Sequence, residues 1–339
     1  MKTLPPSRKI QAPAARIHAA SSHSLASEHL PRFSFVLPAF KANYLLESIN
    51  SILNQTIDDL ELIIVNDQSP DDIDSIVALF ENDSRIRYYT NEKNIGRRDL
   101  VLNWNLCCKR SVGEYLILAS DDDVYSLNFL EEVSVLINNY PKVNLIRGRV
   151  RSINEEGAEV EKDHLFPAYM AQDDFLYYAS RGMISVQAQY VYNRKEFVKR
   201  GGFVNFPSAW CSDAATAYMM SDQGVLSTPS IVFTFRKSSF HITGDSSIEN
   251  KIIKLTANYL YWGWVDSFVS HLSVKNYKTK FFEDVSHHKL QVQFDILLSG
   301  IPFYKLSIWI KYCFQNKYLF RSRKIKIFLH AILCQIIHL

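Results

Sequence analysis

The feature that most constrains the fold of this chain is a regular alternation of short apolar segments with helical patterns, which begins at Phe33. The apolar segments are typical of buried strands, and each is followed by residues with the apolar spacing of an amphipathic helix. The four predicted strands read FSFVLP (33–38), LELIIVND (60–67), RIRYYTN (85–91) and EYLILAS (114–120). Strands that alternate with helices form parallel sheets covered on both faces, so the sequence predicts an α/β fold with a central, mostly parallel sheet flanked by helices.

Apolar residues recur at helical spacing within 45–53 and 73–80, and further helices are expected over about 97–110 and after Ser126. For the second helix, Ser69 is the expected N-cap and Pro70 the first helical residue. After about Val150 the alternation weakens, and we expect residues 151–210 to be irregular. A further helix is predicted over 212–223, because Gly224 follows as a stop signal.

A charge count divides the chain into a basic start, an acidic body and a basic end. Residues 1–32 carry five Lys or Arg against one Glu, residues 301–339 carry seven Lys or Arg and no acid, and the net charge of +3 therefore leaves −8 for residues 33–300. Residues 1–32 lack an apolar period, so we predict a disordered basic tail. We divide the rest into 33–150, 151–245 and a helical C-terminal region over 246–339, which is amphipathic and basic at 301–339.

The C-terminal stripe repeats Ile, Leu and Phe over 325–337 at spacings of three and four, next to Arg321 and Arg323. This pattern predicts an amphipathic basic helix. We expect it to lie peripherally on the anionic inner face of the plasma membrane, with the aromatic residues of 309–320 as interfacial anchors. The alternative is a C-terminal helix that packs its stripe on the body of the chain or on a second subunit.

Several function classes do not fit this sequence. An acidic body does not suit a nucleic-acid binder, so nucleic acid is not an expected partner. No segment approaches the roughly 20 consecutive apolar residues of a membrane-spanning helix, and residues 1–32 lack the apolar stretch of a secretory signal. The five cysteines are odd in number and irregularly spaced, which indicates a reducing, cytoplasmic compartment.

Polar residues follow three of the predicted strands, in the segments 38–43, 66–69 and 120–123. Ligands of open parallel sheets bind at the carboxyl ends of the strands, so these segments are the first candidates for a site. The adjacent carboxylates of Asp121, Asp122 and Asp123 repel one another unless a cation neutralises them, and Mg²⁺ or Mn²⁺ prefers oxygen ligands. The sequence therefore predicts a divalent cation here, the alternative being a solvated turn that caps the next helix.

Glycine-rich phosphate loops are absent from the sequence, since neither GxGxxG nor GxxxxGK[ST] occurs. Dinucleotide-dependent dehydrogenases and P-loop enzymes are therefore excluded. Phosphate groups of a ligand would be held by the cation, with Arg97 or Arg98 as additional candidates.

Four segments in order resemble those of glycosyltransferase family 2, the inverting enzymes of the GT-A fold that include many bacterial polysaccharide enzymes. They read FVLPAFKANYLLESINSILNQT, LELIIVNDQSPDD, RYYTNEKNIGRR and GEYLILASDDDVYSLNFLEE. The resemblance covers about residues 33–135 closely and 180–245 loosely. It implies that 33–150 form the nucleotide-sugar-binding half of a GT-A domain and that 151–245 form its acceptor-binding half.

The resemblance also implies roles for single residues on the donor side. Asp67 would accept a hydrogen bond from a uracil-like base, with an Asx-turn as the alternative reading of this residue. Asp122 would bind the metal, with Asp123 as a competing candidate and His241 as a further one. The residues implied to contact the nucleotide are Pro38, Ala39, Phe40, Asp67, Asn94, Gly96, Arg97, Arg98 and Asp121.

On the acceptor side, the resemblance implies a catalytic base after the Gly201-Gly202-Phe203 segment. Asp213 is the acid in this stretch, although Ser212 replaces the Glu that usually precedes it. The alternative is that Asp213 is a first-turn acid complementing the helix dipole. Trp210 is a candidate for stacking on an acceptor sugar, and a buried core Trp is the alternative. Arg236 is a candidate contact for the diphosphate.

The implied function is a Mn²⁺- or Mg²⁺-dependent inverting transfer of a sugar from a nucleoside-diphosphate donor, expected to be a UDP-sugar. The expected acceptor is a hydroxyl of a saccharide or lipid-linked saccharide in surface polysaccharide synthesis. A non-catalytic sugar-nucleotide-binding or membrane-associated scaffold is the alternative. A sugar nucleotidyltransferase is less favoured, because PAFKAN lacks the glycine-rich, Arg-containing loop of those enzymes.

Overall fold

The computed structural model describes residues 30–237, 247–319 and 321–337. His241 and residues 1–29 of the predicted tail lie outside the described residues. The end of that predicted tail joins the fold, because Arg32 donates its backbone N–H to Asp59 Oδ1 at 3.0 Å. The described residues from Pro31 onward belong to one compact unit.

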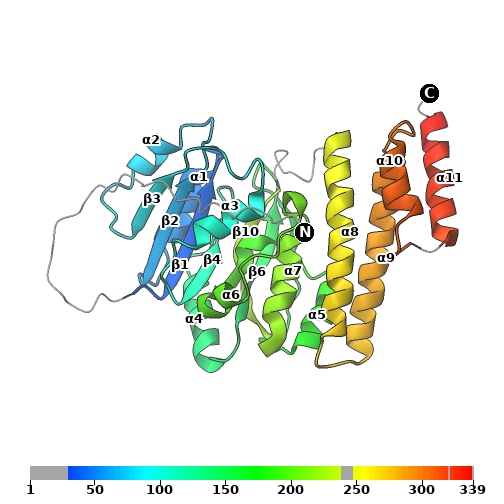
Figure 1. Cartoon of the computed structure of the whole chain (residues 1–339). Helices are drawn as coiled ribbons and strands as arrows, with labels where there is room; N and C mark the ends of the chain where they lie inside the picture. The colour runs from blue at the N-terminus through cyan, green and yellow to red at the C-terminus, as the bar shows by residue number, and fades with distance from the viewer. Residues whose placement is uncertain (1–29, 238–246, 320, 338–339) are drawn as a thin grey trace, which may run out of the picture. The chain divides into compact units, whose positions relative to one another are not determined.

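One sheet organises this unit (Figure 1). Its main path of strands has the order β3-β2-β1-β4-β9-β6-β10-β5, and β7 and β8 pair with β6 and β10 beside this path. The strands are β1 (Phe33–Ala39), β2 (Leu60–Asn66), β3 (Ile86–Thr90), β4 (Tyr115–Leu118), β5 (Val124–Tyr125), β6 (Leu145–Ile153), β7 (Glu159–Lys162), β8 (Tyr169–Met170), β9 (Tyr190–Asn193) and β10 (Val225–Arg236). The four strands predicted from the sequence pair in parallel. β9 then runs antiparallel to both β4 and β6, and β10 is parallel to β6. The mostly parallel sheet is therefore confirmed for the first half of the fold.

Helices cover both faces of the sheet. Alternate residues of β1 point to opposite sides, so each face presents apolar side chains that the helices bury. Phe33, Phe35 and Leu37 pack in one core with α1 (Leu45–Leu53), α2 (Ile73–Ala78) and α4 (Phe129–Asn139). Val36 packs in a second core with α3 (Leu100–Cys108), α5 (Gln172–Ser180), α6 (Arg194–Lys199) and α7 (Ser212–Met220). Short 3₁₀ turns occupy Gln187–Gln189, Pro207–Ala209 and Ser221–Gln223.

The second helix begins later than predicted. α2 starts at Ile73, and its N-cap is Asp72, whose carboxylate accepts the Ser75 N–H at 3.0 Å. The predicted cap, Ser69, instead donates its hydroxyl to the backbone carbonyl of Phe40. Ser69 therefore ties the end of β2 to the turn after β1 and does not start the helix.

The C-terminal helices build a third core beside α7. α8 (Ile248–Ser270) and α9 (Tyr277–Ser299) pack side by side, followed by α10 (Leu306–Trp309), a π-helical turn (Ile310–Phe314) and α11 (Arg321–Ile337) (Figure 1). The stripe of α11 divides: Ile327 and Ala331 are buried, whereas Ile325, Leu329 and Leu333 are 54%, 53% and 58% exposed. None of the described helices is long and apolar enough to cross a membrane.

Candidate active site

The ends of β1 and β4 are joined directly by the acidic triplet. Asp121 Oδ2 accepts the backbone N–H groups of Phe40 at 2.9 Å and Lys41 at 2.7 Å. The turn after β1, which contains no glycine, is thus held by a carboxylate 80 residues further along the chain. Of the residues predicted to line a nucleotide base, Phe40 is exposed at this turn, Pro38 is half-buried and Ala39 is part of the first core.

The three carboxylates of the triplet are buried and take different partners. Asp122 forms an ion pair with Lys41 Nζ and accepts the hydroxyl of Ser120. Asp123 Oδ1 accepts the Arg236 backbone N–H at 3.0 Å, at the end of β10. The triplet is therefore not a solvated turn, because all three residues are at most 5% exposed.

Burial changes the pKa values of these groups. Loss of solvent raises the pKa of Asp121, and the positive charge of Lys41 opposes that rise. Loss of solvent also raises the pKa of Asp123 well above its ordinary value, and the negative charge of Asp122 adds to the rise. Burial alone would lower the pKa of Lys41, but the neighbouring carboxylates of Asp121 and Asp122 raise it above its ordinary value.

The carboxylate oxygens around Lys41 decide whether this site suits a divalent cation. Lys41 Nζ lies 3.5 Å from Asp121 Oδ1 and is also paired with Asp122 Oδ2, so two carboxylate oxygens converge on one positive charge. Mg²⁺ bound with a nucleotide usually takes one or two protein carboxylates, the phosphates and water, which this pair fits. Asp123 fits less well, because Lys41 pairs with Asp121 and Asp122, whereas Asp123 Oδ1 is bonded to the backbone at the end of β10. Among the described residues, no group of three or more Asp, Glu, His or Cys is arranged to hold a metal ion.

Arg236 closes the opposite side of the triplet. Its Nε donates to the Asp122 carbonyl at 3.1 Å, and its guanidinium pairs with Glu47 at 2.6 Å and lies 4.0 Å from the centre of the Tyr44 ring. A cavity of about 330 Å³ borders Arg236 and Glu47, and Arg151 also lines it. A buried guanidinium beside the acidic triplet is suited to an anionic ligand.

The carboxylate of Asp67 organises the segment after β3. Asp67 Oδ1 accepts from the Asn91 side chain at 2.7 Å and from the Ile95 N–H at 2.9 Å, and Oδ2 accepts from the Gly96 N–H at 2.7 Å. A side chain at Gly96 would place its Cβ 2.8 Å from Asp67 Oδ2, so the close approach requires glycine. The predicted bond from Asp67 to a base stays a prediction, since three donors of the chain already use this carboxylate.

The rest of this segment, residues 94–98, leads into α3. Asn94 accepts the Arg97 N–H at 2.7 Å, and the side chains of Arg97 and Arg98 are both exposed. Asp99 caps α3 and also accepts from the Asn205 side chain at 3.1 Å. The segment therefore connects the expected donor half with the expected acceptor half.

Asp213 lies in the first turn of α7, after a strained segment. Ser208, Ala209 and Cys211 have φ values of 54°, 56° and 66°, a region that residues with a side chain rarely adopt. Such conformations cost free energy and cluster at functional sites. Burial raises the pKa of Asp213, and backbone N–H bonds partly oppose this rise.

The negative charge of Asp213 acts on buried tyrosines of this region, and Trp210 precedes it in the chain. Burial raises the pKa of Tyr190 to about 12, and the charge of Asp213 contributes to that rise. The Trp210 indole N–H donates to Asn258 at 3.0 Å, and Lys254 Nζ lies 5.0 Å from the indole ring. Trp210 is half-buried against α8, so its stacking on an acceptor stays a prediction.

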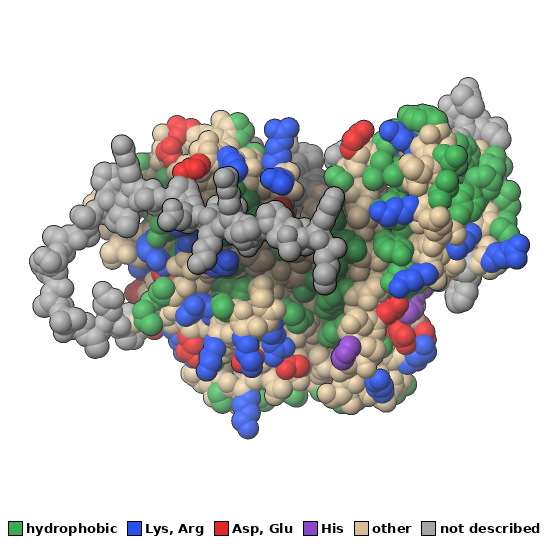
Figure 2. Space-filling model, viewed as in Figure 1, with side chains coloured by type: hydrophobic (Ala, Val, Ile, Leu, Met, Phe, Trp, Pro, Cys, Tyr) green, Lys and Arg blue, Asp and Glu red, His purple; other side chains and the backbone are tan. Residues whose placement is uncertain are grey.

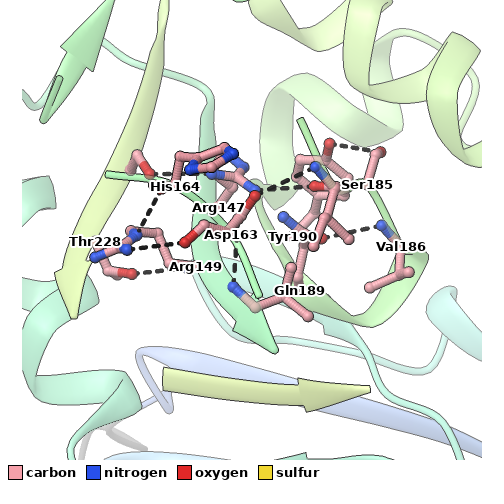
Figure 3. Close-up of polar contacts among 12 residues, drawn as sticks. Arg147, Arg149, Asp163, His164, Ser185, Val186, Gln189, Tyr190 and Thr228 are labelled. Carbon is pink, nitrogen blue, oxygen red and sulfur yellow. Dashed lines mark hydrogen bonds and ion pairs between the residues drawn. The ribbon is translucent and has the colours of Figure 1, made fainter. Parts of the chain in front are cut away.

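A buried ion pair holds the segment between β6 and β9, which leads to Tyr190 (Figure 3). Arg147 on β6 pairs with Asp163 and donates to the Ile184 carbonyl at 2.9 Å, and both side chains are at most 1% exposed. Tyr190 OH in turn lies 2.8 Å from the Ser185 hydroxyl. We did not identify Arg147 from the sequence, although the alternation of Arg with apolar residues in LIRGRVRSI was the available signal. Lys41 was missed as well, because nothing local pairs it with residues 80 positions away.

Residues 34–199 match the family model for Glycosyl transferase family 2. An uncharacterized glycosyltransferase of Rickettsia felis is 29% identical over 139 residues, which are 40% of this chain and 22% of that protein. The GalNAc(5)-diNAcBac-PP-undecaprenol beta-1,3-glucosyltransferase of Campylobacter jejuni is 36% identical over 96 residues, 28% of this chain and 30% of that protein. The matched regions span 14–22% of the length of the three Rickettsia relatives found first.

The fold also occurs in solved structures. The S. aureus protein TarS (residues 1–349, in complex with UDP-GlcNAc) superposes with a TM-score of 0.62 at 14% identity, over 90% of each chain. The mannosyltransferase PcManGT from Pyrobaculum calidifontis, in complex with GDP-Man and Mn²⁺, gives a TM-score of 0.51 at 14% identity, over 91% of this chain and 87% of that one. The predicted GT-A fold with a helical C-terminal region is confirmed.

Proposed function

Residues 34–199 form a glycosyltransferase domain of family 2, and from this premise we propose that the chain transfers a sugar from a nucleoside-diphosphate donor to an acceptor hydroxyl. The observation that carries the proposal is the junction of the strand ends, where Asp121 holds the turn after β1 and Asp122 and Arg236 lie beside it. The acceptor we propose is a saccharide or a lipid-linked saccharide. Support comes from the Campylobacter relative, whose name specifies an undecaprenol-linked substrate.

We propose that Asp213 is the general base of an inverting displacement. Its carboxylate removes the proton of the acceptor hydroxyl, whose oxygen forms a bond to the anomeric carbon. The bond from that carbon to the diphosphate breaks, and the electron pair leaves with the diphosphate. A carboxylate whose pKa is raised by burial is a stronger base near neutral pH, which suits this role.

On the donor side, Asp121 and Phe40 form the proposed nucleotide contact, and we propose a UDP-sugar as the donor. Asp121 and Asp122 would hold a divalent cation, which when bound neutralises negative charge on the diphosphate. Arg236 supplies a fixed positive charge at the same edge of the sheet.

The test is release of nucleoside diphosphate from a panel of nucleotide sugars, with saccharide and undecaprenol-linked acceptors. Asp122→Asn and Asp213→Asn are each expected to lower transfer at least about 100-fold, because each removes a charge from the reaction centre. Glu249→Gln is the matched control, since Glu249 is an exposed first-turn acid of α8. Full activity in both variants would contradict the assignment, and donor binding without transfer to any acceptor would favour the scaffold.

We further propose that the C-terminal helices bind the anionic inner face of the membrane. Exposed apolar side chains gather over α10 and α11 together with Lys and Arg, as Figure 2 shows at its upper right. The exposed apolar residues of this surface are Tyr304, Leu306, Ile310, Phe314, Ile325, Leu329 and Leu333. Apolar side chains with Lys and Arg around them are the pattern of interfacial helices.

Cosedimentation with vesicles of anionic phospholipid tests this localisation. The chain is expected to bind these vesicles, less at high salt, and Leu329→Gln combined with Leu333→Gln is expected to remove most of the binding. Val198→Gln is the control, because Val198 is 59% exposed on the transferase domain. Failure of the unmodified chain to bind, or equal binding by the double variant and the control, would refute the proposal.

A further inference from the structure

We propose that Lys41 is an internal counter-ion that occupies the cation position between Asp121 and Asp122, and that a divalent cation binds there only by displacing it. The inference rests on the proposed function for the identity of the incoming ligand, a divalent cation with a nucleoside diphosphate. It goes beyond that function because it assigns Lys41 a role that competes with the metal.

The first observation is that both carboxylates face the same ammonium group. Lys41 Nζ is paired with Asp122 Oδ2 and lies 3.5 Å from Asp121 Oδ1. The side chains of Asp121 and Asp122 are only 7% and 3% exposed, so water cannot neutralise them effectively. Buried carboxylates that lose their counter-charge are strongly destabilising, and Lys41 supplies that charge.

The second observation is that the backbone of Lys41 is fixed while its side chain has a route out. Its N–H donates to Asp121 Oδ2 at 2.7 Å, so this residue stays beside the triplet. Its side chain is 32% exposed, well above either partner, and ends a flexible four-carbon stem. Rotation of that stem toward solvent would free both carboxylate oxygens without moving the turn after β1.

Competition follows from the charges. A divalent cation and an ammonium group at the same two oxygens repel each other, so the carboxylates are neutralised by one or the other. Lys41 therefore lowers the metal affinity of the nucleotide-free chain, and it keeps the acidic triplet stable when no metal is bound. The extra negative charge of a nucleoside diphosphate would then favour the metal, because the phosphates add ligands that Lys41 cannot replace.

The test measures Mn²⁺ binding to the full chain by electron paramagnetic resonance of free Mn²⁺, without donor or acceptor. Lys41→Met is expected to lower the Kd for Mn²⁺ roughly tenfold or more, since a unit charge about 4 Å away is removed. Without metal, the Tm of Lys41→Met is expected to be lower than the Tm of the unmodified chain. Added Mn²⁺ is expected to raise the Tm of the variant more than it raises the Tm of the unmodified chain. Lys41→Gln serves as a second variant if the methionine variant folds poorly.

Lys237→Met is the matched control. This substitution removes the same charge from the end of β10, but Lys237 pairs with Glu161 on the surface. It is expected to leave the Kd for Mn²⁺ within about twofold, as removal of an exposed ion pair has little effect. The tighter Mn²⁺ binding of Lys41→Met is also expected to disappear when Asp122→Asn is added to it. Unchanged or weaker Mn²⁺ binding in both Lys41 variants would overturn the inference, as would an equal gain in the control.

The outcome is separable from the proposed function. If the unmodified chain transfers sugar while the Lys41 variants bind Mn²⁺ no more tightly, the counter-ion role is wrong and the transferase remains. If the Lys41 variants bind Mn²⁺ more tightly while no donor is turned over, the counter-ion role stands and the proposed reaction fails.

Discussion

Replacing Asp213 by Asn separates a catalytic base from a first-turn acid that only complements the helix dipole, because the two roles predict opposite changes in stability. Asp213 is a half-buried first-turn residue of α7, and burial raises its pKa. The folded chain therefore binds the proton of this carboxyl more tightly than the unfolded chain. Ionisation of Asp213 then costs folding free energy, a cost that develops as the pH rises from the ordinary value of 3.8 to the raised value.

Asp213→Asn removes this cost, so the variant is expected to be more stable than the unmodified chain near pH 7. The difference should disappear below about pH 3.8, where the unmodified carboxyl is protonated in both states. If Asp213 mainly complements the helix dipole, the same variant should instead lose about 0.3–1 kcal/mol at pH 7. Thermal unfolding of both chains at several pH values measures the sign directly.

The activity of the same variant gives the second readout. General-base catalysis contributes about 10²–10⁴-fold, so kcat is expected to fall by that factor, or roughly 3–5 kcal/mol in activation free energy. The unmodified enzyme should lose activity as the pH falls through the raised pKa of Asp213, and the variant should lack that acidic limb. A variant that is less stable at pH 7 and retains most of its kcat would refute the reasoning.

Three further predictions concern the surroundings of the site. Gly96→Ala should displace the segment bound to Asp67 and weaken donor binding about tenfold in a nucleotide titration, because the new Cβ would lie 2.8 Å from the carboxylate. Arg147→Met should lower the free energy of unfolding in urea by about 3–5 kcal/mol, and Arg147→Met with Asp163→Leu should recover most of that loss. Trp210→Phe should raise the acceptor KM roughly two- to tenfold with little change in kcat, because it loses the indole hydrogen bond but keeps the ring.

The strands of the first half of the fold could be predicted because their pattern is local. β1 and β2 are buried along almost their whole length, and parallel strands covered on both faces require such continuous apolar runs. The start of α2 was predicted wrongly for the opposite reason. Ser69 has the right chemistry for an N-cap, but its hydroxyl bonds to a carbonyl 29 residues away, and Asp72 caps the helix instead.

The partners of the candidate site could not be predicted, because they come from distant parts of the chain. The acidic triplet was evident as three adjacent Asp residues, but Lys41 lies 81 positions before Asp122, and Arg236 lies 113 positions after Asp123. Only the sheet order, which places β1 next to β4 and β10 next to β5, brings these groups together. The charge count for residues 33–300 therefore gives the negative sign of the site's charge, but it does not show which basic residues neutralise that charge.

The remaining hydrogen-bonding capacity of each carboxylate indicates which acids are available for chemistry. A carboxylate offers about four acceptor positions. Asp67 uses three of them on the segment 91–96, so its main effect on a ligand is exerted through the position of that segment. For Asp213, the groups that oppose the rise of its pKa are backbone N–H groups at the start of its own helix. The partial burial of Asp213 carries a desolvation cost, and a substrate hydroxyl that donates to this carboxylate would offset part of that cost.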